Sequence, residues 1–416
     1  MNPLIQSLAA ENAPRHLLAA LGLLQFRNPS VDRLRCLSEF ERTQFFRFCD
    51  DRQLTLMLPH VCPSLAPWAS ETVRAKANRY NVRFERLKRE LFEIVAAFEH
   101  ANLEFVMLKG LSHAPALTPA ANLRGQGDID LWLLGSSVHA AREVLRTLGY
   151  RPTQAAKSRH LPPMARPTTW KWRGDLYDPE MPISVELHYE LWSHRTEFVR
   201  VPGTQQFWER KIPRKFDGHT INVLCNEDLV AFAALHLLLH LLHGELPLQR
   251  AWEIAHFLDI HANDNGFWRS WSSVQPAALR QLEISIFCLI GAWFGCNWPK
   301  HLNPEVQMLP QVVVSWLDRF SLAPLRREWK PNKSELWLHL ALVKNRWHKV
   351  RVLVGRLIPL RLPVFVDRGT PAPSRGPRLL AALRQTPTLL SRFLRHMTTF
   401  LPTLLEGLRW LSVRKS

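Results

Sequence analysis

The chain has 416 residues, of which 46% are hydrophobic and 22% charged, a composition that can bury substantial cores and excludes disorder throughout. Its six cysteines include no Cys-x-x-Cys pair, which argues against a disulfide scaffold or a zinc ribbon and favours a reducing compartment. The formal net charge of +18 is uneven, because residues 341–416 hold 15 Lys and Arg residues against Asp367 and Glu406 and so carry +13 of it. This asymmetry indicates a basic tail that meets an anionic partner.

No segment of the sequence looks like a secretory signal or a membrane span. The first residues lack a basic start followed by a continuous apolar stretch. The most apolar stretch, residues 229–242, is about 14 residues long and carries His236 and His240, whereas a spanning helix needs about 20 apolar residues. We therefore expect a cytoplasmic protein, either soluble or peripheral at the inner face of a membrane.

Residues 1–100 are predicted to be helical. The clearest element is a helix from Ser70 to His100, in which apolar residues follow the helical period, namely Val82, Leu87, Leu91, Ile94 and Phe98. This helix leads directly into the segment with the most informative motifs.

Residues 101–225 are predicted to mix strands with a helix. The short apolar run 103–108 indicates a strand that ends at Lys109 and Gly110. A second strand is predicted at 128–133, and a helix capped by Ser136 or Ser137 should follow and run to Leu148. The resulting order is strand, loop, strand, helix.

Two carboxylates stand two residues apart in the second of these strands. In a strand, Asp128 and Asp130 point to the same face, roughly 6 to 7 Å apart, while the apolar residues between and after them enter the core. Like charges this close repel each other unless a cation lies between them. Oxygen ligands on a rigid strand suit a hard ion such as Mg²⁺, which favours phosphoryl or nucleotidyl transfer.

A third carboxylate lies on a later predicted strand. Residues 183–189 alternate cleanly, with Glu186 and His188 on the polar face. The Pro-, Arg- and Trp-rich stretch before it looks irregular, with a short strand expected around Trp170 to Trp172. One tryptophan near these motifs could stack on a base or sugar, although most are expected in the core or an interface; the candidates are Trp132, Trp170, Trp172 and Trp192.

The C-terminal part returns to helical patterns over residues 226–320 and 336–353, and prolines then mark a linker near 359–378 before a basic amphipathic tail. The sequence thus divides into four parts: 1–100, 101–225, 226–355 and 356–416. The tail can lie on an anionic membrane or pack on the body or an acidic protein partner, and both interpretations stay open. Sequence-specific nucleic-acid binding is disfavoured, because no known nucleic-acid module accompanies the charge.

Three histidines fall on one face of the helix predicted after residue 226. His236, His240 and His243 could bind zinc, but only Glu245 lies near them in sequence, so we favour buried or cleft-lining histidines. The signatures of P-loop enzymes, zinc proteases of the His-Glu-x-x-His type and α/β-hydrolases are absent from the sequence.

Together the motifs resemble the nucleotidyltransferase fold of the DNA polymerase beta superfamily, and more closely a bacterial branch of it. The resemblance covers roughly residues 15–320 and rests on Leu108-Lys109-Gly110, Arg124, Gly127-Asp128-Ile129-Asp130-Leu131 and Val185-Glu186-Leu187-His188. Two features depart from the usual pattern. The Gly-Gly or Gly-Ser pair appears as Gly110-Leu111-Ser112, farther from Asp128 than usual, and Glu186 stands where Asp is commoner.

The resemblance implies an α+β fold, with a small mixed-sheet polymerase-beta-like core flanked by N- and C-terminal helical regions. It implies a nucleotidyltransferase that moves NMP from an NTP to an acceptor, in glycan or modified-peptide biosynthesis, with two Mg²⁺ ions, or Mn²⁺, on the catalytic residues Asp128, Asp130 and Glu186. The implied nucleotide-binding residues are Lys109, Gly110, Ser112, Arg124 and His188. The alternative is an inactive nucleotide-binding module that acts as a peripheral-membrane or complex-assembly protein.

Overall fold

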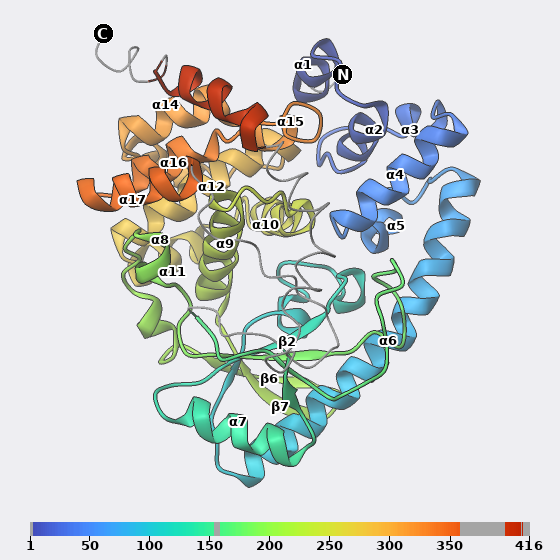
Figure 1. Ribbon diagram of the computed structural model, residues 1–416, viewed down its shortest axis with the longest axis vertical. Helices are drawn as coiled ribbons and strands as arrows, with labels where there is room; N and C mark the ends of the chain where they lie inside the picture. The colour runs from blue at the N-terminus through green and yellow to red at the C-terminus, as the bar shows by residue number, and fades with distance from the viewer. Residues whose placement is uncertain (1–2, 154–158, 358–395, 409, 411–416) are drawn as a thin grey trace.

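The computed structural model describes residues 3–153, 159–357, 396–408 and 410. In this part of the chain a seven-stranded mixed sheet lies beneath a larger body of helices (Figure 1). The combination confirms the expected α+β class, with helical regions on either side of the strands in sequence.

Short helices open the chain, and a long one follows. The short ones are α1 (Pro3–Ala10), α2 (Arg15–Leu23), α3 (Asp32–Arg35), α4 (Glu39–Asp51) and α5 (Leu58–Val61). Helix α4 begins with a capping box, in which Ser38 accepts from the backbone of Glu41 and the Glu41 side chain accepts from the backbone of Ser38. The long helix α6 (Pro67–His100) confirms the helix predicted from Ser70.

The sheet has the strand order β3-β4-β5-β2-β1-β7-β6. The strands are β1 (Val106–Met107), β2 (Asp128–Trp132), β3 (Arg151–Pro152), β4 (Met164–Ala165), β5 (Ser184–His188), β6 (Ile212–Phe216) and β7 (His219–Val223). Strands β2 and β5 run parallel at the centre, which places Asp130 opposite Glu186 and Trp132 opposite His188. Helix α7 (Ser137–Thr147) follows β2 as predicted and packs on the sheet together with α6 (Figure 1).

Two strand predictions need correction. The run 103–108 contributes only the two residues of β1. The prediction of a strand around Trp170 to Trp172 is wrong, because that stretch is irregular. Within it, Trp170 Nε1 donates a hydrogen bond to Asp178 at 2.9 Å. The strand that pairs with β5 on the side away from β2 is β4, which begins six residues before Trp170.

The hairpin of β6 and β7 was not predicted, although the sequence carries its signal. Asp217 and Gly218 form the turn, and both have positive φ, 47° and 90°. Asp-Gly is a favoured pair for a two-residue hairpin turn, because such a turn needs left-handed backbone at both central positions. The hairpin extends the sheet beyond β1.

The remaining helices form the larger body. They are α8 (His194–Glu197), α9 (Asn226–Leu242), α10 (Leu248–Ile260), α11 (Asn265–Val274), α12 (Ala277–Phe294), α13 (Asn303–Gln307), α14 (Gln311–Phe320), α15 (Ala323–Arg326), α16 (Glu335–Leu342) and α17 (Arg346–Leu357). Packing joins α1 to α5 to these later helices in one apolar core, and the Phe26 amide donates to the Phe294 carbonyl at 3.0 Å. The sheet, α6 and α7 form a second core. The site described next lies where the two cores meet.

Within the described residues, one helix is long and apolar enough to cross a membrane by length and composition alone. This helix is α12, and 61% of its apolar window is buried among its neighbours. A core helix passes the same test, so α12 is weak evidence for a span.

Candidate functional site

The structure brings the predicted acidic residues of β2 and β5 together. Because these strands are parallel and in register, Asp130 and Glu186 lie side by side, and His188 follows on the same face. Ligand atoms of Asp130, Glu186 and His188 all lie within 4.8 Å of one another. Asp128 is on the same strand as Asp130 but is not part of this group of three.

Lys109 reaches the acidic cluster from the end of β1. Its Nζ donates to Asp130 Oδ1 at 2.7 Å, and His188 Nε2 lies 2.9 Å from the same oxygen. The other oxygen, Asp130 Oδ2, is buried and has no hydrogen-bond partner among the described residues. Because a buried carboxylate oxygen without a partner is costly, a hydrogen-bond donor or a cation at Oδ2 would stabilise this arrangement.

The pKa values of the three carboxyl groups move in different directions. Burial favours the neutral form of Asp130, but Lys109 and His188 outweigh it and hold its pKa well below the usual range. Burial also opposes ionisation of Glu186, yet hydrogen bonding to His188 and the charge of His160 bring its pKa down to about 2. The pKa of Asp128 is raised, by burial and by the charge of Asp130. Asp128 is therefore the carboxyl group that most needs a further cation.

His160 joins the cluster from a segment that the sequence left irregular. Its Nε2 lies 3.5 Å from Glu186 Oε2, and a backbone bridge pairs His160 with His188 beside β5. Nothing in the local sequence pattern identified this residue, because its position depends on the pairing of distant segments.

The loop before β2 is fixed by helix α6. Tyr80 Oη donates to the Arg124 carbonyl at 2.6 Å and accepts from the Gln126 amide at 2.8 Å. Arg83, fully buried, donates to the Gln126 carbonyl at 3.4 Å and to the carbonyl of Met181 just before β5. One helix thus ties together the loop that precedes β2 and the loop that precedes β5.

Gly110 and Ser112 lie in the turn after Lys109. Gly110 has φ of 73°, and a Cβ on it would come within 2.2 to 2.5 Å of the Gln126 side chain, so only glycine fits. Ser112 is buried, and its hydroxyl has no hydrogen-bond partner among the described residues. The tight approach of Gln126 explains the glycine on packing grounds alone.

Arg124 meets a carboxylate that the sequence did not single out. Its Nε lies 3.2 Å from Glu253 Oε1, and His113 Nδ1 lies 3.3 Å from the other oxygen of Glu253. Gln249 Nε2, one turn earlier on α10, donates to Glu253 Oε1 at 2.5 Å. Burial opposes ionisation of Glu253, but Arg124 and His113 outweigh it and lower its pKa. Glu253 therefore holds the Arg124 guanidinium in place.

Two more guanidinium groups act on the acidic pair. Burial and Arg124 lower the pKa of Arg250, while the charges of Asp128 and Asp130 oppose that shift. Burial likewise lowers the pKa of Arg159, and Asp130 is among the acidic groups that raise it. Lys109, Arg124, Arg159 and Arg250 are thus four cationic side chains that act on the acidic pair, and Glu253, which pairs with Arg124, is a fourth carboxylate beside the three of the cluster. Lysine and arginine side chains of this kind bind phosphate oxygens.

The three histidines of α9 do not form a common metal site among the described residues. His236 Nε2 lies 3.3 Å from His240 Nε2, and His240 contacts Arg250, whereas His243 turns to Glu197 at 3.0 Å. Burial and Lys109 lower the pKa of His236 well below its usual range. The buried His236 and the largely buried His240, whose pKa values are both lowered, agree with the interpretation favoured from sequence, whereas the side chain of His243 is exposed and does not.

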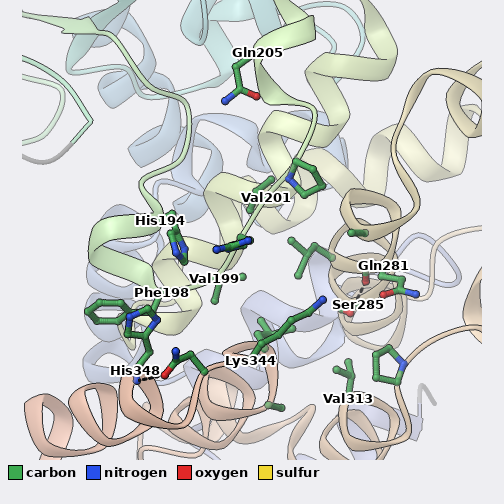
Figure 2. A pocket seen from close by; sticks show the side chains of 18 residues that line it. His194, Phe198, Val199, Val201, Gln205, Gln281, Ser285, Val313, Lys344 and His348 are labelled. Carbon is green, nitrogen blue, oxygen red and sulfur yellow. Dashed lines mark hydrogen bonds between the residues drawn. The ribbon is translucent and has the colours of Figure 1, made fainter.

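Two cavities flank the helical body. One of about 430 Å³ has a polar lining that includes His240, Glu245 and Arg250. A larger one of about 880 Å³ lies between the α8 region, α12, α14 and the connection from α16 to α17, with Val199 and Val313 among its apolar lining (Figure 2). None of the predicted site residues lines either of these two cavities.

Comparison with known proteins gives one match. A sequence model of the family described as "Uncharacterised nucleotidyltransferase" matches residues 38–295, which include the whole sheet and the acidic cluster. Searches of curated proteins and of solved structures found no match.

Proposed function

Because the chain belongs to this nucleotidyltransferase family, we propose that it transfers NMP from an NTP to an acceptor and releases pyrophosphate, with Mg²⁺ as cofactor. The observation that carries the proposal is the in-register pairing of β2 and β5, which sets Asp130 beside Glu186. The cationic side chains around this pair supply the charge that a triphosphate needs.

The residues present fit a divalent cation. Asp130 Oδ2 is buried without a partner, Glu186 lies within reach, and the raised pKa of Asp128 marks a carboxyl group short of positive charge. Carboxylate oxygens favour Mg²⁺ or Mn²⁺ over softer metals. A bound cation would neutralise phosphate charge and lower the pKa of an acceptor hydroxyl.

The protein's own side chains would bind and orient the nucleotide. Arg124 is held by Glu253 and Lys109 is held by Asp130, so both cations are positioned before a nucleotide arrives. Lys109 would exchange its contact with Asp130 for a phosphate oxygen. A carboxylate with a pKa of about 2 is a weak base, so Glu186 suits the role of cation ligand better than that of proton acceptor.

The acceptor is proposed to enter through the polar 430 Å³ cavity. Arg250, whose pKa the charges of Asp128 and Asp130 raise, lines that cavity with other charged and amide side chains, which fit a hydroxyl-rich molecule such as a glycan better than an apolar one. A polar modified peptide fits the same lining.

A second candidate function is a catalytically inactive nucleotide-binding module that serves a peripheral-membrane or complex-assembly role. The ion pair between Lys109 and Asp130 favours it, because the lysine already neutralises the carboxylate that a metal would use. This candidate differs from the first in predicting NTP binding without turnover.

Pyrophosphate release from each NTP, with Mg²⁺ or Mn²⁺, separates the two candidates. We expect metal-dependent release by the wild type and a loss of roughly 10³-fold in Asp128→Asn. Asp175→Asn, which replaces a half-buried aspartate paired with Arg79 outside the acidic cluster, is the matched control and should keep full activity. Metal-dependent turnover unchanged in Asp128→Asn and Glu186→Gln would contradict catalysis at this site, and tight NTP binding without release would favour the inactive module.

A further inference from the structure

The helix formed by residues 396–408 has its polar and apolar faces reversed. Its inner face carries Thr399, Thr403 and Gly407, and the two threonines are 1% exposed. Its outer face carries large apolar side chains that are between 46% and 64% exposed, namely Met397, Leu401, Leu405 and Leu408. A helix that covers a soluble core normally buries its leucines and exposes its threonines.

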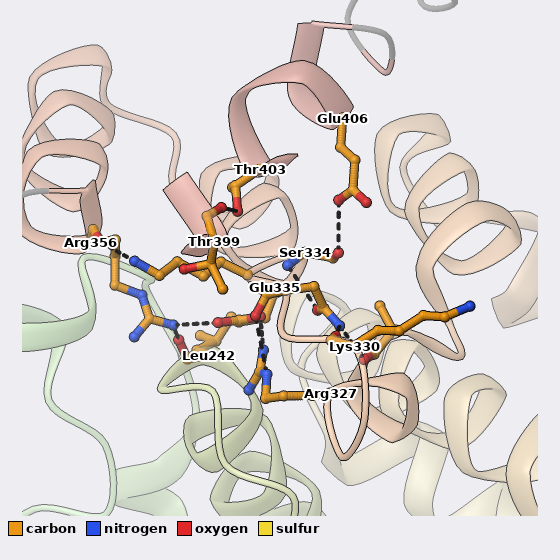
Figure 3. A network of polar contacts seen from close by, with 12 residues as sticks. Leu242, Arg327, Lys330, Ser334, Glu335, Arg356, Thr399, Thr403 and Glu406 are labelled. Carbon is orange, nitrogen blue, oxygen red and sulfur yellow. Dashed lines mark hydrogen bonds and ion pairs between the residues drawn. The ribbon is translucent and has the colours of Figure 1, made fainter. Parts of the chain in front are cut away.

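Small side chains seat this helix closely on the body. Thr403 Oγ1 donates to the Thr399 carbonyl at 2.6 Å, and Thr399 Oγ1 donates to the His396 carbonyl at 3.1 Å, so the buried hydroxyls are satisfied within the helix (Figure 3). A Cβ on Gly407 would come within 2.0 Å of the Trp337 ring. Among the described residues of this segment, Trp410 is the large apolar side chain that packs inward, with its ring 6.1 Å from that of Trp337.

A polar network fixes the orientation of the helix. Ser334 Oγ donates to Glu406 Oε2 at 3.3 Å, and Lys333 Nζ lies 2.5 Å from His396 Nδ1 (Figure 3). His396 also contacts the carbonyl of Leu357, the last residue of α17. The helix is therefore held at both ends by α16 and α17, and its apolar face is directed outward.

The outward face has no charged residue. Its exposed positions are Met397, Thr398, Leu401, Pro402, Leu405 and Leu408. Of the 15 large hydrophobic side chains exposed in the described part of the chain, 7 lie on this helix and on α17, whereas the others are scattered. Clustered exposed apolar side chains mark an interaction surface.

Helix α17 adds cations to the same region. Its exposed Trp347, Val350 and Val354 alternate with the exposed Arg346 and Arg351. Residues 341–357 contain five Lys and Arg residues and no Asp or Glu. Tryptophan next to basic residues is typical of the interface between lipid headgroups and acyl chains.

We propose that this face, formed by α17 and residues 396–408, binds an anionic membrane surface. The leucines and Met397 enter the acyl boundary, and the cations of α17 meet the phosphate headgroups. A second copy of the chain would bring like charge against like charge, since α17 and residues 396–408 together hold four Lys and Arg residues against Glu406 alone. The chain's own residues 358–395 hold seven arginines and one acidic residue, so the same repulsion opposes them as occupants. The proposal does not depend on nucleotidyl transfer.

Vesicle co-sedimentation of the full-length protein tests the proposal. Vesicles of phosphatidylcholine alone are compared with vesicles that also contain phosphatidylglycerol. The test variant combines Leu401→Gln, Leu405→Gln and Leu408→Gln, and the matched control combines Val82→Gln, Ile260→Gln and Met308→Gln, which are exposed elsewhere. We expect binding to the anionic vesicles only, weakened by salt, and a fall of at least about tenfold in affinity for the test variant alone.

Three results would overturn the proposal. One is equal binding by the test variant and the wild type, or no binding of the wild type to anionic vesicles. Another is a wild-type dimer that the test variant converts to a monomer, which would make the face a protein interface. The third is a test variant that unfolds at a clearly lower temperature than the control, which would mean that the chain itself covers the face.

Discussion

Strand β2 and the helix of residues 396–408 both depart from the usual arrangement of apolar interior and polar surface, but in opposite ways. At β2, Asp130 and Lys109 are charged and buried. On the helix of residues 396–408, leucines are exposed and threonines are buried. Burying charge costs free energy unless partners are present, and exposing clustered apolar surface costs solubility. Each arrangement therefore points to a ligand, a polyanion at the first region and an apolar phase at the second.

The two regions also differ in how their partners are supplied. Most charges around Asp130 are already paired within the protein, so the site is organised before a ligand binds. The exposed leucines have no such partner among the described residues. Single substitutions around Asp130 should therefore lower the free energy of unfolding, whereas single substitutions of the exposed leucines should not.

The largest expected effect separates two aspartates of one strand. Asp130→Asn should destabilise the protein by about 3 to 5 kcal/mol, because it leaves the buried Lys109 ammonium without its partner. Asp128→Asn should leave stability unchanged or raise it, because the raised pKa of Asp128 means that its charge is unfavourable in the folded state. Denaturant unfolding at neutral pH measures both, and equal losses would contradict the assignment of charges.

A smaller effect is expected where one buried residue orients another. Glu253→Gln removes the charge that holds Arg124, so the KM for NTP should rise by up to about 100-fold. Steady-state kinetics with varied NTP provide the measurement. Glu283→Gln, also a buried carboxyl group but outside the site, serves as the control and should leave KM unchanged.

Glu283 itself predicts a dependence of stability on pH. Burial raises its pKa well above 4.5, although a Trp271 hydrogen bond at 2.8 Å and the charge of Arg280 oppose the shift. The folded state holds this proton more tightly than the unfolded state, so the stabilisation is present below the unfolded pKa and is lost as pH rises toward the folded pKa. Over that window the wild type should lose about 1.4 kcal/mol per pH unit relative to Glu283→Gln. Unfolding curves across pH that stay parallel for both proteins would contradict this.

The smallest effect is expected on the exposed face. Leu405→Gln should change the free energy of unfolding by less than about 0.5 kcal/mol, because the side chain is already 46% exposed. Thermal unfolding without vesicles measures this, and a loss of several kcal/mol would show that the leucine packs against the protein.

The sequence predicted the elements whose pattern is local. The helical period gave α6, and the alternation of residues 183–189 gave β5 with Glu186 and His188 on its polar face. The β6 and β7 hairpin could have been found from Asp217-Gly218. The first and last residues of the short β1 could not be predicted from sequence, because only its pairing with β2 and β7 defines them.

The local sequence pattern does not identify the residues that complete the site. Arg159 and His160 come from an irregular stretch, and Arg250 and Glu253 come from α10, more than 100 residues after β2. Arg159 and His160 reach the acidic cluster because their segment pairs with the end of β5, and Arg250 and Glu253 come near it because the helical body packs on the sheet. Single-sequence periodicity gives no information on such contacts, although it identified the strands on which they converge.

The central claim is that the carboxylates of β2 and β5 bind a divalent cation together with a nucleotide. Titration of Mn²⁺, followed by electron paramagnetic resonance in the presence of a non-hydrolysable NTP, tests it most directly. The account predicts saturable binding by the wild type and by Asp175→Asn, and loss of that binding in Asp128→Asn and Glu186→Gln. Binding of equal strength in all four proteins, or no binding by the wild type, would contradict it.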